Sequence, residues 1–330
     1  LTTANLPATL GADAPYENMG TIQTKGWELA IDYRHTFKNG LHFGVTASVA
    51  DDKTEVTKWT YNTKIPSYGA TGWWDKSAYK EGMVLGDIWG LQFDRFLTED
   101  DFNADGSLKA GLPDQTKVFP AGYQFAPGDV LYKDLDNNGE IVKQTNTNDK
   151  GDLSVIGNAL PRLQFGLNLD AAWKGFDISM FFQGVAKRKL WAAGNQVLPG
   201  FTTGEPFYKG AEDYWTPENT DAFYPRPMDY KQSASGNYSV NDRYLLNMAY
   251  LRLKTFTVGY SLPKVWLRKF KVQGLRVYFT GENLFTIDGV KPAIDPEIGI
   301  RTASGKSDQR NFGRSYPYQK TVSFGIQLSL

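Results

Sequence analysis

Cysteine is absent from this chain, and histidine is nearly so. The 330 residues include only two histidines, His35 and His42. The absence of cysteine excludes a disulfide framework and a thiol nucleophile, and two histidines cannot form a histidine-rich metal cluster. The sequence also has no Gly-x-Ser-x-Gly segment of the kind that holds a serine nucleophile. The composition therefore points away from an enzyme.

Net charge and long apolar runs are also lacking. The 36 Lys and Arg residues balance the 36 Asp and Glu residues, so the chain has no basic excess of the kind that nucleic-acid binding needs. No run of about 18 apolar residues is present that would form a membrane helix. A membrane β-barrel remains compatible with the mean hydropathy of -0.43, because its strands alternate apolar and polar residues.

Aromatic residues and glycine are plentiful, and the apolar residues alternate. The last eleven residues, 320–330, have one face of small polar groups and one wholly apolar face, because side chains alternate across a strand. We expect the apolar face to contact lipid; its residues are Val322, Phe324, Ile326, Leu328 and Leu330.

The same period of two recurs along the chain. It predicts strands at residues 21–37, 41–51, 87–97, 162–173, 176–184, 251–261, 275–284 and 320–330, and residues 263–270 predict a helical turn. Tight turns at 38–40 and 174–175 alternate with connections of roughly 30 to 60 residues, far longer than soluble domains usually carry. Short turns that alternate with long outer loops are typical of outer-membrane barrels. The pattern predicts an all-β protein, a transmembrane antiparallel β-barrel with long extracellular loops.

Two adjacent tryptophans, Trp73 and Trp74, lie in the first aromatic-rich connection. They can bind substrate by stacking on sugar rings, since apolar CH faces pack well on aromatic rings. The structural alternative is that they belong to the interfacial aromatic girdle or pack within the loop.

Acidic residues follow a calcium-loop pattern at residues 134–141. Asp134, Asp136 and Asn138 occupy positions 1, 3 and 5, and Gly139 occupies position 6, as in a D-x-[DN]-x-[DN]-G loop. Glu140 would add its backbone carbonyl at position 7. Position 12 is a threonine and not the expected glutamate, so a later acid, Asp149 or Asp152, would have to substitute. The alternative is an Asx-rich turn without metal.

Short motifs recur in blocks at residues 18–28, 128–139, 156–161 with 165–166, 214–219, 259–263, 281–286 and 316–317. Together these blocks resemble one family, the SusC/RagA-type TonB-dependent transporters. These blocks follow the family's order and cover nearly the whole chain. One departure is Leu330, where outer-membrane barrels often end in an aromatic residue.

The resemblance implies that residues 1–330 are the carboxy-terminal part of a 22-stranded barrel. The sequence begins at Leu1 without an initiator Met or a signal peptide, so we expect either a mature chain or, as we favour, a carboxy-terminal piece of a longer protein. The resemblance implies that the plug domain and the TonB-contacting segment lie upstream. The implied function is TonB-dependent import of a nutrient, an oligosaccharide or a peptide, across the bacterial outer membrane. The implied partners are membrane lipid, the TonB complex and a SusD-like surface lipoprotein, for which loops 55–86 and 187–250 are the expected contacts. No nucleic-acid partner is expected, and calcium is the one candidate cofactor.

Two other classes fit the same alternation. A secreted carbohydrate-binding β-sandwich would bury its apolar rows and dissolve without detergent, whereas a passive porin would lack a plug and a TonB contact.

Overall fold

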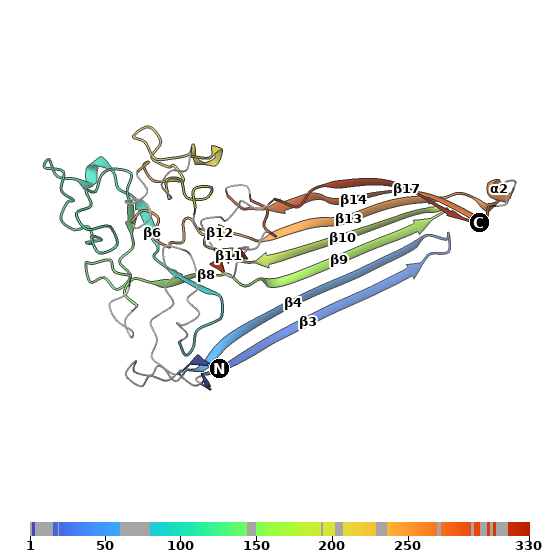
Figure 1. Cartoon of the computed structure of the whole chain (residues 1–330), viewed down its shortest axis with the longest axis horizontal. Coiled ribbons are helices and arrows are strands. Elements are labelled where there is room, and N and C mark those ends of the chain that lie inside the picture. The colour runs from blue at the N-terminus through green and yellow to red at the C-terminus, as the bar shows by residue number, and fades with distance from the viewer. Residues whose placement is uncertain are drawn as a thin grey trace.

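The computed structural model describes residues 2–3, 16–18, 20–59, 80–143, 150–192, 194–201, 207–228, 236–268, 272–291, 294–297, 302–303, 306–307 and 316–330. A long, twisted sheet occupies one end of the molecule, and the long connections gather at the other end (Figure 1). The carboxy terminus lies at the far end of the sheet, beside the short helix α2 (Figure 1).

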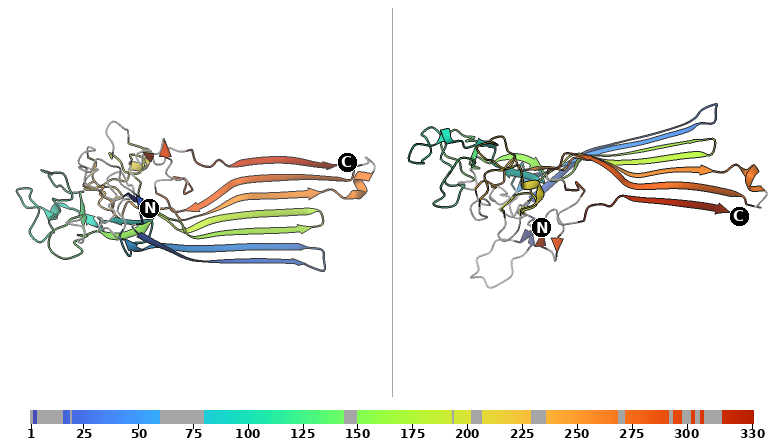
Figure 2. Two further views of the ribbon diagram at one scale, coloured as in Figure 1. Left: turned by 60° about the horizontal axis from the view of Figure 1, so that its bottom comes forward. Right: turned by 90° about the horizontal axis from the view of Figure 1, so that it is seen from above.

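The sheet has seven antiparallel strands in the order β17-β14-β13-β10-β9-β4-β3. The seven strands therefore follow their order in the chain, and the short strands that lie between them in sequence belong to the long connections and not to this sheet. The bounds are β3 (Gly20–Thr36), β4 (His42–Trp59), β9 (Arg162–Trp173), β10 (Phe176–Lys187), β13 (Tyr250–Ser261), β14 (Gly274–Asp288) and β17 (Thr321–Ser329). The outer strands β3 and β17 lie at opposite edges (Figure 2), so the described strands form an open, curved sheet.

The strand register confirms that one face of the sheet is apolar. Residues paired directly across antiparallel strands point to the same side, so a row can be followed from β3 to β17. One such row runs through His35, Phe43, Ala171, Ile178, Val258, Phe279 and Phe324. The next row along the strands runs through Tyr33, Val45, Leu169, Met180, Phe256, Gly281 and Val322.

The opposite face is polar or has small residues. Its rows lie between the apolar ones, and one of them runs through Arg34, Gly44, Asp170, Ser179, Thr257, Thr280 and Ser323. Charged residues on this face pair with one another, as Arg276 does with Asp177 at Nε–Oδ1 2.9 Å. A sheet with one apolar and one hydrated face, seven strands wide, is what a barrel wall requires.

All the short connections lie at one end of the sheet. Residues 37–41 join β3 to β4, and Lys174 and Gly175 join β9 to β10. The latter pair has φ values of 48° and 90°, the positive values that a two-residue hairpin turn of type I′ needs. Residues 262–273 join β13 to β14 and contain α2 (Lys264–Leu267), which confirms the predicted helical turn.

The segment 87–97 is the one predicted strand that does not join the sheet. It divides into β5 (Asp87–Gly90), which pairs with β8 (Ser154–Asn158), and β6 (Phe93–Phe96), which pairs with β7 (Val130–Tyr132). The physical reason is burial on both sides: Ile88, Leu91 and Leu97 have no exposed surface, so they pack inside the long connections and do not alternate toward lipid. The prediction of eight barrel strands was wrong by this one.

The remaining elements are short. They are β1 (Thr2–Thr3), β2 (Tyr16–Glu17), η2 (Glu99–Asp101), β11 (Lys189–Leu190), η3 (Lys209–Ala211), β12 (Leu246–Asn247), β15 (Thr302–Ala303) and β16 (Lys306–Ser307). Within the described ranges, no helix has both the length and the apolar character needed to cross a bilayer.

Candidate functional site

The long connections pack together into one body, which we call the connection module (the described parts of residues 80–161 and 188–249). It has two hydrophobic clusters. The first joins Ile88 of the first connection to Trp191, Leu198 and Tyr244 of the second, and it also takes in Val290 after β14. The second joins Leu91, Val130 and Tyr132 of the first connection to Trp215 of the second. Two connections that are far apart in sequence therefore share both clusters.

A buried carboxylate, that of Asp129, holds the two connections in register. Asp129 has no exposed surface. Arg226 Nε donates to its Oδ1 at 2.8 Å, and Tyr123 Oη and Asn237 Nδ2 donate to the same oxygen at 2.8 and 2.9 Å. Burial and the nearby Asp129 charge raise the pKa of Tyr123 well above its usual range, so this hydroxyl remains a donor. The cluster links Tyr123 and Asp129 to Arg226 and Asn237.

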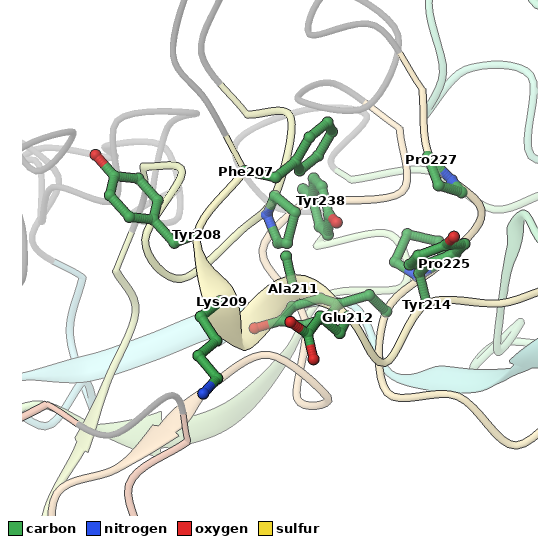
Figure 3. A pocket seen from close by; sticks show the side chains of 11 residues that line it. Phe207, Tyr208, Lys209, Ala211, Glu212, Tyr214, Pro225, Pro227 and Tyr238 are labelled. Carbon is green, nitrogen blue, oxygen red and sulfur yellow. The ribbon is translucent and has the colours of Figure 1, made fainter.

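A cavity of about 370 Å³ opens on the module. Its lining consists mostly of aromatic and proline rings: Pro199, Phe207, Tyr208, Tyr214, Tyr224, Pro225, Pro227 and Tyr238. Figure 3 shows the rings of Phe207, Tyr238 and Tyr214 around the cavity, with Ala211 between them. Phe207 is 58% exposed and Tyr214 is 41% exposed, so both rings are open to solvent. Cavities of this size and character are typical binding sites.

Polar side chains also line this cavity: Tyr208, Tyr214, Tyr224 and Tyr238 carry hydroxyls, and Lys209 and Glu212 carry charges. Lys209 and Glu212 point away from the rings of Phe207 and Tyr238 (Figure 3). The Tyr224 hydroxyl donates to the Val197 carbonyl at 2.9 Å, and burial, with a smaller effect of Asp213, raises the pKa of Tyr224 to about 12. The lining therefore combines aromatic ring surface with tyrosine hydroxyls, which lets it pack against an apolar group.

The acidic loop brings together two of its predicted ligands and the later acid Asp152. One carboxylate oxygen from each of Asp134, Asp136 and Asp152 lies within 4.8 Å of the others. Asp134 Oδ1 is buried and accepts no hydrogen bond from the described residues. Oxygen ligands at this spacing can converge on a hard cation such as Ca²⁺.

Hydrogen bonds fix the loop around this cluster. The Gly139 amide donates to Asp134 Oδ2 at 2.8 Å, and Gly139 has a φ of 86° that favours glycine. The Leu135 and Val142 amides donate to the two oxygens of Asp152 at 2.7 and 2.8 Å. Asp152 has no exposed surface, so it closes the loop from the far end.

The charges of the cluster repel one another. Desolvation raises the pKa of Asp136, and the neighbouring charges of Asp152 and Asp134 raise it further. Desolvation also acts on Asp134, but backbone amides, first that of Gly139, outweigh it and leave the pKa of Asp134 lowered.

Asn138 and Glu140 have other partners in this geometry. Asn138 Oδ1 accepts from the Glu140 amide at 2.7 Å, and Asn138 Nδ2 donates to Asp136 Oδ2 at 3.0 Å. The Glu140 carboxylate forms an ion pair with Lys117, which leaves its backbone carbonyl as the predicted ligand. These hydrogen bonds are those of an Asx-rich turn. The cluster of three carboxylates is a further feature, which such a turn does not need.

The other predicted site residues have separate locations. Trp73 and Trp74, and the acid Asp149, lie outside the described residues. Val322, Phe324, Ile326 and Leu328 are all exposed on one face of β17, and Leu330 follows it. Sequence reasoning missed Asp129 and the rings of the cavity, because they come from non-periodic segments that only the tertiary structure brings together.

Comparison with known proteins places this geometry in context. No family model matches the chain. TonB-dependent receptor P3 of Formosa agariphila is 26% identical over 335 residues, 98% of this chain and 30% of the receptor. TonB-dependent receptor SusC of Bacteroides thetaiotaomicron is 22% identical over 322 residues, 95% of this chain and 27% of SusC. The chain thus spans about a third of the length of these curated relatives.

Solved structures share the fold. The RagAB peptide transporter matches with a TM-score of 0.62 at 19% identity, covering 98% of this chain and 31% of that chain. The RagAB peptide importer in its open-open state matches with a TM-score of 0.62 at 18% identity, covering 100% of this chain and 31% of that chain. The seven-stranded sheet is therefore part of a transmembrane β-barrel wall.

Proposed function

Because the chain is a relative of the SusC/RagA-type TonB-dependent receptors, we propose that it forms part of an outer-membrane transporter that imports a nutrient with energy from the TonB complex. The observation that carries this proposal is the two-faced sheet. Its apolar rows continue across all seven strands, and its opposite rows carry paired charges and hydroxyls, as a water-filled lumen permits. Relatives named TonB-dependent receptors support the energy source.

The nutrient in this proposal is an oligosaccharide or a peptide, and a SusD-like surface lipoprotein works with the barrel. The connection module offers the surface for that lipoprotein. We assign the cavity beside Phe207 and Tyr214 to an apolar side chain of the lipoprotein, because exposed aromatic rings around a pocket are typical anchors of protein interfaces.

The test uses cells that carry or lack the gene for the intact protein. Growth on glycan or peptide mixtures as the limiting nutrient should require the gene and should also require TonB. The lipoprotein should copurify with the intact protein, and Phe207→Ala with Tyr214→Ala should weaken that association by about tenfold or more, as hot-spot residues do. Uptake that persists without TonB would indicate a passive porin and overturn the proposal.

The two other classes are less well supported. A β-sandwich needs a second sheet to cover its apolar rows, and no second sheet of comparable width occurs among the described residues. The relatives are named as receptors, which is consistent with a transporter and not an enzyme.

We also propose that Asp134, Asp136 and Asp152 bind Ca²⁺. Two observations support this site: three carboxylates converge although they repel one another, and Asp134 Oδ1 is buried without a hydrogen-bond donor among the described residues. A cation would offset both costs. Asn138 and the Glu140 carbonyl are the further ligands that the loop pattern predicts.

Millimolar CaCl₂ should raise the melting temperature of the connection module in the intact protein by a few degrees relative to EDTA, since a ligand that binds only the folded state stabilises it. Asp134→Asn and Asp136→Asn should remove this shift. The control is Asp105→Asn, because Asp105 caps an exposed turn through Ser107 and is not part of the acidic cluster. A melting temperature that is unchanged by millimolar Ca²⁺ would exclude the site.

A further inference from the structure

The short turns at the end of the sheet carry charge of one sign. Their ionisable residues in the described ranges 37–41, 174–175, 262–268 and 272–273 are Lys38, Lys174, Lys264 and Arg268, and these ranges contain no Asp or Glu. All four side chains are exposed. The chain as a whole has a net charge of +0, so these turns carry a local excess of positive charge.

These four cations are not used in ion pairs within the described part of the chain. Arg276, which lies near the same end on the polar face, differs because it forms two hydrogen bonds with Asp177. Lys174 Nζ instead lies 4.4 Å from the ring centroid of Trp173. The turn cations thus remain available to an external anion.

Aromatic residues stand next to these cations on the lipid-facing side. Ile326 pairs with Val277, Val277 with Tyr260, Tyr260 with Phe176 and Phe176 with Trp173. This register places Tyr260, Phe176 and Trp173 on the same face as the apolar row of β17. Phe176 and Tyr260 have ring centroids 4.5 Å apart, so the last row before the turns is an aromatic band.

Helix α2 lies beyond the strand ends at the same end of the sheet (Figure 1) and carries exposed apolar residues. Val265 and Trp266 are 71% and 61% exposed, whereas Leu267 is buried and holds the helix against the protein. Lys264 and Arg268 flank the two exposed apolar residues. An aromatic ring with long cationic side chains beside it matches the boundary between acyl chains and headgroups, where the ring lies among the chains and the cation reaches the phosphate.

We propose that this turn rim, defined by Lys38, Lys174, Lys264, Arg268, Trp173 and Trp266, binds anionic phospholipid headgroups in the leaflet at the short-turn end. Lipid is favoured over a protein partner because Trp173 of the rim lies in the same row as Phe176, Tyr260 and Ile326 on the apolar face of the sheet. The rim rests on the barrel fold and is independent of the transported substrate. In this arrangement α2 binds lipid, a role that is separate from substrate transport.

Each cation near an anionic surface contributes about fivefold in lipid affinity. The test is the lipid that copurifies with the intact protein from mixed phosphatidylethanolamine and phosphatidylglycerol membranes, measured by mass spectrometry. The variant Lys264→Gln with Arg268→Gln should reduce the bound phosphatidylglycerol by about tenfold or more. Adding Lys38→Gln and Lys174→Gln should reduce it further.

The matched control is Lys109→Gln with Lys133→Gln, which removes two exposed lysines of the connection module and should leave bound lipid unchanged. Lys264→Arg should also retain the lipid because it keeps the charge. Heat-modifiable migration on gels verifies that each barrel has assembled. Equal phosphatidylglycerol in rim and control variants, or its absence from the wild type, would overturn the proposal. Loss of a copurifying protein with unchanged lipid would overturn it in favour of a protein-docking surface.

Discussion

Single buried charges organise the connection module. Arg95 forms a two-point contact with Asp101, with Nη1–Oδ2 and Nη2–Oδ1 distances of 2.6 and 2.7 Å, and the Thr98 amide donates to the same carboxylate. The Arg95 guanidinium, against some opposing desolvation, lowers the pKa of Asp101 to about 2. The contact fixes the 3₁₀ turn η2 against β6.

This pair predicts an acid-dependent loss of local stability. The folded pKa of Asp101 lies below the unfolded value of about 3.9, so its stabilisation is fully present above pH 4 and is lost as the pH falls toward 2. We expect a loss of about 1–2 kcal/mol, discounted because Arg95 is half-exposed. The protection of the Phe102 amide, measured as its hydrogen-exchange rate relative to the intrinsic rate at each pH, should fall over this pH range, and Asp101→Asn should remove that fall. The same fall in protection in the variant would contradict the assignment.

The acidic loop shows what a local pattern can and cannot predict. The spacing of Asp134, Asp136 and Gly139 predicted a turn with converging oxygens, because those positions act through short-range backbone geometry. The pairing of Glu140 with Lys117 was not predictable, because a side chain 23 residues away decides it. The fully buried state of Asp152 likewise depends on tertiary packing.

At the scale of the element, the strands of the sheet were the most predictable part of the molecule. Residues 162–173 were predicted as a strand, and β9 has the same bounds. Alternation with a period of two predicts these strands well because one face of the sheet meets an apolar environment and the other meets water. Every second residue must therefore be apolar. The segment 87–97 has no such contrast, since it is buried within the connection module, and its strand character was misassigned to the barrel.

Strand β4 extends eight residues beyond its predicted end at Asp51. Its extension, 52–59, pairs with the amino-terminal part of β3, and its residues include Asp52, Lys53 and Glu55. These charged side chains break the alternation of apolar and polar residues that lipid contact requires. We therefore infer that this part of the hairpin lies outside the bilayer. Asp51 itself accepts from Arg162 Nη2 at 2.6 Å, which ties β4 to the start of β9.

The lipid-facing assignment of β17 predicts an asymmetric response to charge. Phe324 packs against Phe279 with ring centroids 5.3 Å apart, whereas Ser323 points to the polar face beside Thr280. Phe324→Asp should destabilise the barrel by about 2 kcal/mol, because a charge on the lipid face must be desolvated. Ser323→Asp is the matched control and should have little effect. The fraction of heat-modifiable barrel in membranes measures both, and equal assembly of the two variants would contradict the assignment.

At the scale of the whole molecule, the two ends of the sheet differ in the length of their connections and in the interactions that hold them. The short-turn end has hairpins that are determined by local residues such as Lys174 and Gly175. The other end carries connections whose length was evident from the sequence but whose shared clusters were not. Those clusters combine residues separated by about a hundred positions, and no local periodicity encodes such contacts.

Ion pairs attach a further connection to the barrel wall. Arg252 on β13, with a side chain only 4% exposed, contacts Asp295 and Glu297 from the segment after β14. The Tyr318 amide donates to the other oxygen of Asp295 at 3.0 Å, just before β17 begins. Breaking a buried pair by removing one partner is costly, so this cluster fixes how the chain enters its last strand.

The shared second cluster predicts that damage to one long connection spreads to the other. Trp215 is buried with Val130 and Tyr132, so Trp215→Ala should leave a cavity and destabilise the module by about 3–5 kcal/mol. Hydrogen exchange should then accelerate at the amides of residues 130–132, more than 80 positions earlier in the chain. The exposed Trp266 provides the control, because Trp266→Ala creates no internal cavity and should leave those amides protected. If the two long connections were independent loops, Trp215→Ala would change exchange only near residue 215, and the description of a single connection module would fail.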